Sequence, residues 1–86
     1  MPFGSLVERG LLAPGSKLFD RMRRISAVVA ADGTVVSGRV RGSIHKVGAA
    51  VQNAPSCNGW TFWHFERDGR LVPLDVLRSA EPANEA

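Results

Sequence analysis

The chain has 86 residues, of which 44% are hydrophobic and 22% are charged, a composition that suits one small globular domain and argues against wholesale disorder. Its 11 basic and eight acidic side chains give a formal net charge of +3. The single cysteine, Cys57, excludes an internal disulfide. Neither a membrane-length apolar run nor a signal-peptide pattern occurs, so we expect a cytoplasmic protein without a membrane partner.

Arginine dominates the basic residues. Nine of the 11 are Arg, whose planar fork suits phosphates and guanine edges. Residues 1–80 hold all 11 basic side chains and six of the acidic ones, a net charge of +5, whereas residues 81–86 are expected to form a flexible C-terminal tail. This balance favours a polyanionic partner, and the alternative is a soluble surface that is simply basic.

The first half of the chain predicts one helix and three strands. Apolar residues over 4–12 favour a short helix, and residues 17–20 favour a short strand. Two β-branched runs, 25–30 and 34–40, flank Asp32-Gly33 and therefore predict a hairpin.

The second half predicts a capped helix, a hairpin and a closing helix. Ser43 is a candidate N-cap for a helix that runs to about Asn53. A strand over 60–66 is expected to turn into a second strand over 70–72, and Pro73 suits the first turn of a helix that ends near residue 80. The order αβββαββα predicts a single α+β domain over residues 1–80, with antiparallel hairpins packed against short helices.

The start of the central helix is a candidate anion site, because the first N–H groups of a helix are unpaired and carry positive potential. Ser43 adds a hydroxyl, and His45 and Lys46 lie on the polar side of the predicted helix. Arg39 and Arg41 add positive charge just before it. The alternative is that Ser43 only caps the helix.

The segment around Trp60 is a candidate tip for reading a base. In a strand, alternation places Trp60 on the face opposite Trp63, so Trp63 is expected in the core. Trp60 then either completes the core or remains exposed for stacking on a base. Asn58 could pair with an adenine edge, or it could simply tolerate a left-handed turn.

Catalytic and metal chemistry find little support in the sequence. Cys57 has no predicted helix N-terminus to lower its pKa, and the two histidines and one cysteine lack the spacing of a zinc site. No phosphate-binding glycine loop occurs. We therefore expect no active site, metal or cofactor within this chain.

Three segments resemble a known family. They are Gly-Ser-Ile-His-Lys-Val-Gly-Ala at 42–49, Cys-Asn-Gly-Trp-Thr-Phe-Trp at 57–63, and Leu-Val-Pro-Leu-Asp-Val-Leu-Arg at 71–78. They resemble the C-terminal domain of the cell-cycle-regulated (CcrM-type) adenine DNA methyltransferases, which methylate adenine in GANTC. The same module is similar to the RAMA domain, named for restriction enzyme and adenine methylase association. The similarity runs from Pro2 to about Ser79.

The resemblance implies an accessory domain for DNA binding and recognition. The catalytic Asp-Pro-Pro-Tyr and Phe-x-Gly-x-Gly motifs of these enzymes are absent here, so methyl transfer and S-adenosylmethionine would belong to the catalytic domain of a parent chain. That domain is the expected partner besides DNA, together with a homodimer formed through the parent enzyme, and a bacterial, nucleoid-associated setting is implied. The matching positions that would face DNA are Ser43, Asn58, Trp60 and Arg78. The alternative function is a protein-interaction module that docks the catalytic domain or a second subunit.

Overall fold

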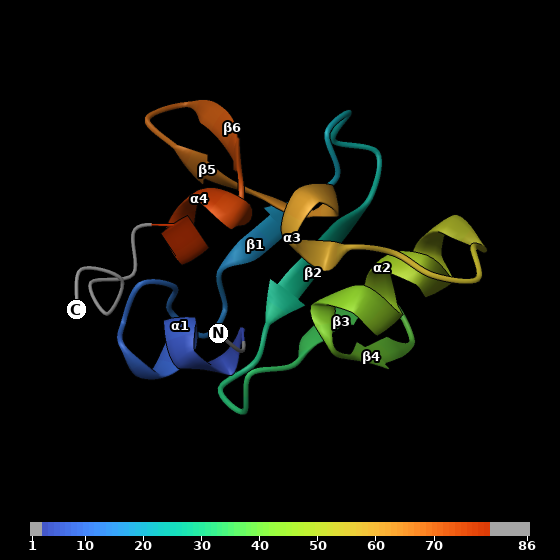
Figure 1. The fold of residues 1–86 in the computed structure, drawn as a ribbon, viewed down its shortest axis with the longest axis horizontal. Helices are drawn as coiled ribbons and strands as arrows, with labels where there is room; N and C mark the ends of the chain where they lie inside the picture. The colour runs from blue at the N-terminus through green and yellow to red at the C-terminus, as the bar shows by residue number, and fades with distance from the viewer. Residues whose placement is uncertain (1–2, 80–86) are drawn as a thin grey trace.

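In the computed structural model, residues 3–79 are described and form a six-stranded antiparallel sheet and four helices (Figure 1). The predicted tail over 81–86 and the end of the predicted closing helix lie outside these residues. In chain order the elements are α1 (Gly4–Glu8), β1 (Lys17–Phe19), β2 (Ser26–Val29), β3 (Val35–Ser37), β4 (Val40–Gly42), α2 (Ile44–Gln52), α3 (Gly59–Phe62), β5 (His64–Arg67), β6 (Arg70–Pro73) and α4 (Asp75–Ser79).

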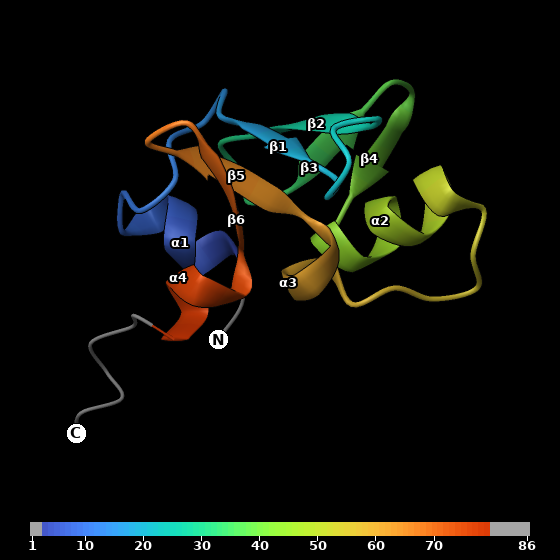
Figure 2. The ribbon, with the colours of Figure 1, turned by 90° about the horizontal axis from the view of Figure 1, so that it is seen from above.

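The strands lie in the order β4-β3-β2-β1-β5-β6, so the N-terminal and C-terminal hairpins meet where β1 pairs with β5. The described helices lie on one side of the β1–β4 part of the sheet (Figure 2). Between the two layers is one core, built mainly from alternate strand residues and the inner faces of the helices. Its largest fully buried side chains are Trp63, Leu6, Leu18, Ile44, Leu74, Val29, Val35 and Val47. The α+β class predicted from the sequence is confirmed.

The predicted strand over 34–40 is two strands. The chain turns back after Ser37, which pairs with Val40, and Gly38 takes a φ of +59° in the turn. Positive φ is easily adopted by glycine, so Gly38 was the signal for this turn within an otherwise β-branched run.

The predicted strand over 60–66 is wrong in its first half. Asn58 caps a short helix there by accepting a 3.0 Å hydrogen bond from the Trp60 N–H, so residues 59–62 are helical and β5 starts only at His64. The strand alternation expected for Trp60 and Trp63 therefore does not apply.

The boundaries of the terminal helices also differ from the prediction. The first helix ends at Glu8 and is followed by Gly10 with a φ of +77°. Pro73 is the last residue of β6, opposite His64, and does not begin the closing helix. Because β6 is an edge strand, the missing N–H of Pro73 can face away from the ladder. Among residues 3–79, no helix is long and apolar enough to cross a membrane.

Candidate nucleic-acid interface

The start of α2 has the structure that the sequence predicts. Ser43 is the N-cap, and its Oγ accepts a 3.0 Å hydrogen bond from the Lys46 N–H. Ile44 and Val47 are buried against the sheet, whereas His45 and Lys46 are exposed. No acidic residue lies in the first turn of α2, so no carboxylate from this helix offsets the positive potential at its N-terminus.

The short helix α3 is joined tightly to this end of α2. The Gly59 N–H donates a 2.9 Å hydrogen bond to His45 Nδ1, and the Trp63 indole N–H donates a 3.0 Å bond to the buried Ile44 carbonyl. A Cβ added at Gly59 would lie 2.6 Å from the Ile44 carbonyl carbon. Gly59 therefore permits the close approach of α3 to α2, within the fold itself.

The hydrogen bond from Gly59 also fixes the tautomer of His45. A backbone N–H can only donate, so Nδ1 must be unprotonated and the neutral ring carries its hydrogen on Nε2. His45 is exposed, so its Nε2–H is available as a donor at the surface.

Asn58 is partly engaged in the fold. Its side-chain oxygen accepts the Trp60 N–H, which leaves the two amide hydrogens without a partner among the described residues. The side chain is exposed beside the His45–Gly59 contact. The structure thus brings together four of the predicted residues, Ser43, His45, Lys46 and Asn58, which we call the α2–α3 face.

Trp60 is a core residue, and its predicted role as an exposed stacking tip is contradicted. Only 5% of its surface is exposed. Phe3 meets its ring edge-on with the centroids 6.2 Å apart, and the Arg78 guanidinium carbon lies 4.8 Å from the ring centroid. The helical path of residues 59–62 turns this indole inward. Trp63 is fully buried, as the sequence predicts.

Arg78 and Arg41, two of the predicted DNA-facing cations, have partners within the fold. Arg78 covers Trp60 and forms an ion pair with Asp75, one turn earlier on α4. Arg41 pairs with Asp32 at 3.1 Å. The Thr34 hydroxyl, the Thr34 N–H and Arg41 together lower the pKa of Asp32 to about 2, so this carboxylate stays charged. Arg39 is exposed in the β3–β4 turn and has no partner among the described residues.

Three further arginines, which the sequence analysis left without a role, follow Asp20 in the β1–β2 loop. They are Arg21, Arg23 and Arg24. The sequence signal for this loop is an aspartate followed by several arginines. An Asp side chain at the start of a turn commonly accepts hydrogen bonds from backbone N–H groups of the turn.

No group of three or more His, Cys, Asp or Glu side chains within residues 3–79 could hold a metal ion. Burial raises the pKa of the Cys57 thiol, which favours the unreactive protonated form, although a hydrogen bond with Gln52 acts in the opposite direction.

Comparison with known proteins identifies the family of this chain. The family described as Restriction Enzyme Adenine Methylase Associated (RAMA) matches residues 1–83. Over 78 residues the chain is 33% identical to the type II methyltransferase M.HinfI of Haemophilus influenzae, an alignment that covers 91% of this chain and 22% of that protein. The chain thus spans only about a fifth of the length of this relative. With nearly all of its residues matched, the chain belongs to the RAMA family.

Proposed function

We propose that this chain is the accessory DNA-binding domain of an adenine-N6 DNA methyltransferase that acts on GANTC sites. Its α2–α3 face binds the phosphate backbone, and methyl transfer from S-adenosylmethionine belongs to the catalytic domain of the parent protein. The parent works on the nucleoid in the cytoplasm, and a homodimer of the parent would supply two such faces.

The α2–α3 face is the observation that carries this proposal. Its four side chains offer a hydroxyl, an imidazole N–H, an ammonium and an amide, all of them exposed. These groups can donate hydrogen bonds to phosphate oxygens, and they lie at the positive end of a nine-residue helix. RAMA membership and the similarity to a type II methyltransferase support the link to adenine methylation.

The same face also constrains the mode of binding. The Asn58 oxygen already accepts a backbone N–H, so the cap fixes the amide and leaves only one lone pair of the oxygen for a paired contact with an adenine edge. Trp60 is buried and cannot stack on a base. The donors that remain suit phosphate and sugar contacts, which position the protein on DNA, more than they suit base reading.

Titration of the chain into a duplex that contains GANTC and into one with the site scrambled tests this function. We expect binding to both duplexes, because phosphate contacts are largely independent of sequence. Calorimetry with S-adenosylmethionine should show no binding, since the cofactor motifs are absent. If neither duplex binds, and the chain instead binds the separately produced methyltransferase part of its parent, the docking alternative is correct.

A further inference from the structure

The β1–β2 loop is a preformed turn organised by Asp20. Its Oδ1 accepts a 2.8 Å hydrogen bond from the Ile25 N–H, and its Oδ2 accepts a 3.4 Å bond from the Met22 N–H. Two backbone bonds, from Arg23 to the Asp20 carbonyl and from Asp20 to the Ile25 carbonyl, close the loop further. Asp20 is 9% exposed, and its carboxylate accepts hydrogen bonds from the loop backbone and forms no ion pair with Arg21 or Arg24.

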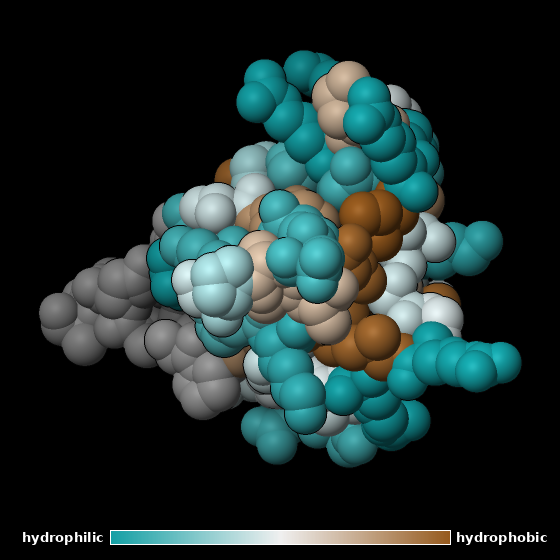
Figure 3. All heavy atoms as spheres, turned by 90° about the vertical axis from the view of Figure 1, so that its right-hand side faces the viewer, coloured by the Kyte–Doolittle hydropathy of each residue, from teal (hydrophilic) through white to brown (hydrophobic). Residues whose placement is uncertain are grey.

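The loop presents three arginines, two of them unpaired within residues 3–79, and one apolar side chain to solvent. Arg23 is held in place, because it pairs with Glu66 at 3.2 Å and lies over the Phe19 ring at 5.1 Å. Arg21 and Arg24 are exposed and have no partner among the described residues. Met22 between them is 64% exposed, well above the other exposed large hydrophobic residues. In Figure 3 the top of the molecule is a largely hydrophilic projection, separated from the hydrophilic surface below it by an apolar strip.

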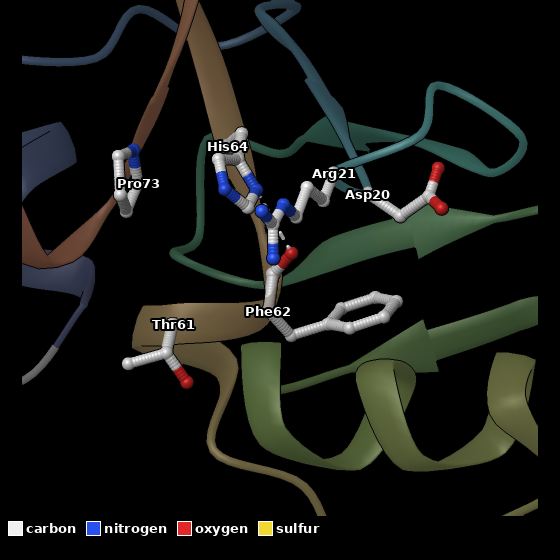
Figure 4. Close-up of a pocket in the computed structure, with 6 residues that line it drawn as sticks. All are labelled: Asp20, Arg21, Thr61, Phe62, His64 and Pro73. Carbon is white, nitrogen blue, oxygen red and sulfur yellow. Dashed lines mark hydrogen bonds between the residues drawn. The ribbon is translucent and has the colours of Figure 1, made fainter.

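A hollow of about 520 Å³ lies at the base of this loop. It is lined by Asp20, Arg21, Thr61, Phe62, His64 and Pro73 (Figure 4). Arg21 reaches from the loop toward His64 and the Phe62 carbonyl, whereas the Asp20 carboxylate is turned the other way. The volume falls within the range of ligand sites, and the walls combine the Arg21 guanidinium with the apolar faces of Phe62 and Pro73. That combination suits a nucleotide unit, with phosphate beside the guanidinium and the sugar or base against the apolar wall.

We infer that the β1–β2 loop is a second DNA contact, in which Arg21 and Arg24 bind the phosphates of a strand and Met22 lies against its sugars or bases. This inference rests on the proposed function and adds a contact separate from the α2–α3 face. The four hydrogen bonds of the loop hold its backbone before binding, so little ordering entropy is lost when DNA arrives. Proteins that bind the minor groove also combine arginines with an apolar side chain that inserts between bases.

Two double variants with the same change of charge test the loop. R21A/R24A removes the loop cations, and R67A/R70A removes two exposed arginines from the β5–β6 hairpin. Duplex affinity is measured over a range of salt concentrations, with a melting curve for each variant. We expect R21A/R24A to lose about tenfold or more in affinity and to make the slope of log affinity against log salt shallower by about 2, with a smaller loss for R67A/R70A. R21K/R24K, which keeps the charge, should recover part of the affinity, and Met22→Ser should weaken binding without changing the slope.

Each outcome bears on one claim. The loop inference is overturned if the unsubstituted protein binds DNA and R21A/R24A binds it equally well. It is also overturned if both double variants lose the same affinity. In either case the proposed function stands. If R21A/R24A keeps its DNA affinity but binds the methyltransferase part of the parent less well, the loop serves a protein partner and the inference is again wrong. If the folded parent binds no DNA at all, the proposed function itself fails.

Discussion

The backbone N–H of Gly59 donates a 2.9 Å hydrogen bond to Nδ1 of His45, which ties the start of α3 to the first turn of α2. This bond orients the exposed His45 ring and keeps it in the tautomer with Nε2–H outward. It also places Asn58, the residue before Gly59, beside the polar start of α2. The geometry of the candidate DNA surface therefore depends on a contact between two helices within the fold.

Replacement of Gly59 by Ala should disrupt the contact between α2 and α3. The new Cβ would lie 2.6–2.7 Å from three atoms of Ile44, one of them a backbone carbon, so α2 and α3 must move apart. We expect a loss of about 1–3 kcal/mol in the free energy of unfolding, measured by urea titration. Gly4→Ala is the matched control, because its Cβ would meet only Gly33 Cα at 3.8 Å. Equal stability of the two variants would show that the α2–α3 contact is not tight.

Trp60→Ala should unfold a large part of the population. The indole is buried against Phe3 and beneath Arg78, so truncation leaves a cavity and should cost about 3–5 kcal/mol. A domain of this size is stable by only about 4–13 kcal/mol. Melting curves of Trp60→Ala and Trp63→Ala should both fall far below that of Met22→Ala, whose side chain is mostly exposed. A Trp60→Ala variant that melts like the unsubstituted protein would show that Trp60 is not a core residue.

Hydrophobic patterning and capping signals predicted much of the fold and the capped start of α2. Ser43 as the N-cap, the inner face of α2 and the burial of Trp63 follow from helical spacing and side-chain volume, and the structure confirms them. The prediction for Trp60 is wrong because Asn58, which the sequence places in a loop, caps a helix of only four residues. So short a helix carries no periodicity of its own, and the aromatic run resembles a strand.

The partners of charged residues could not be predicted from the sequence. Arg41 and Asp32 are brought together across the β3–β4 hairpin, and Arg78 reaches Trp60 from a separate helix. Both contacts depend on tertiary packing between segments whose spacing carries no signal. The role of Asp20 could not be predicted either, because its partners are backbone N–H groups that only the folded loop brings to its carboxylate.

Acid should destabilise the domain through two aspartates. Burial raises the pKa of Asp20, but backbone hydrogen bonds from Ile25, Arg24 and Met22 lower it more, and the pKa of Asp32 falls to about 2. A folded-state pKa below the unfolded value contributes stability that is present above about pH 4 and is lost as the pH falls through the folded pKa. Urea midpoints should therefore decline as the pH is lowered from about 4 toward about 2, and Asp20→Asn with Asp32→Asn should flatten that decline. An unchanged pH profile in the double variant would contradict these assignments.

Salt dependence should report how many cations contact DNA. Arg41 and Arg78 are each paired with an aspartate, so the cations without a partner among the described residues at the two proposed contacts are Lys46, Arg21 and Arg24. With about three phosphates neutralised, log affinity should fall against log salt with a slope of about −3. A slope near zero would indicate a non-ionic interface and would favour the docking alternative.

The most direct test of the central claim, that the α2–α3 face binds DNA, uses Ser43→Asp and Asn58→Asp. An aspartate at either position keeps the oxygen that caps the helix, and thus the fold, but places negative charge where phosphate should bind. Ala13→Asp, at an exposed position between α1 and β1, is the control for net charge. Duplex affinity should fall at least about tenfold for each of the two cap variants, with melting curves like the parent and a much smaller loss for Ala13→Asp. Cap variants that bind DNA as tightly as Ala13→Asp would show that DNA does not contact this face.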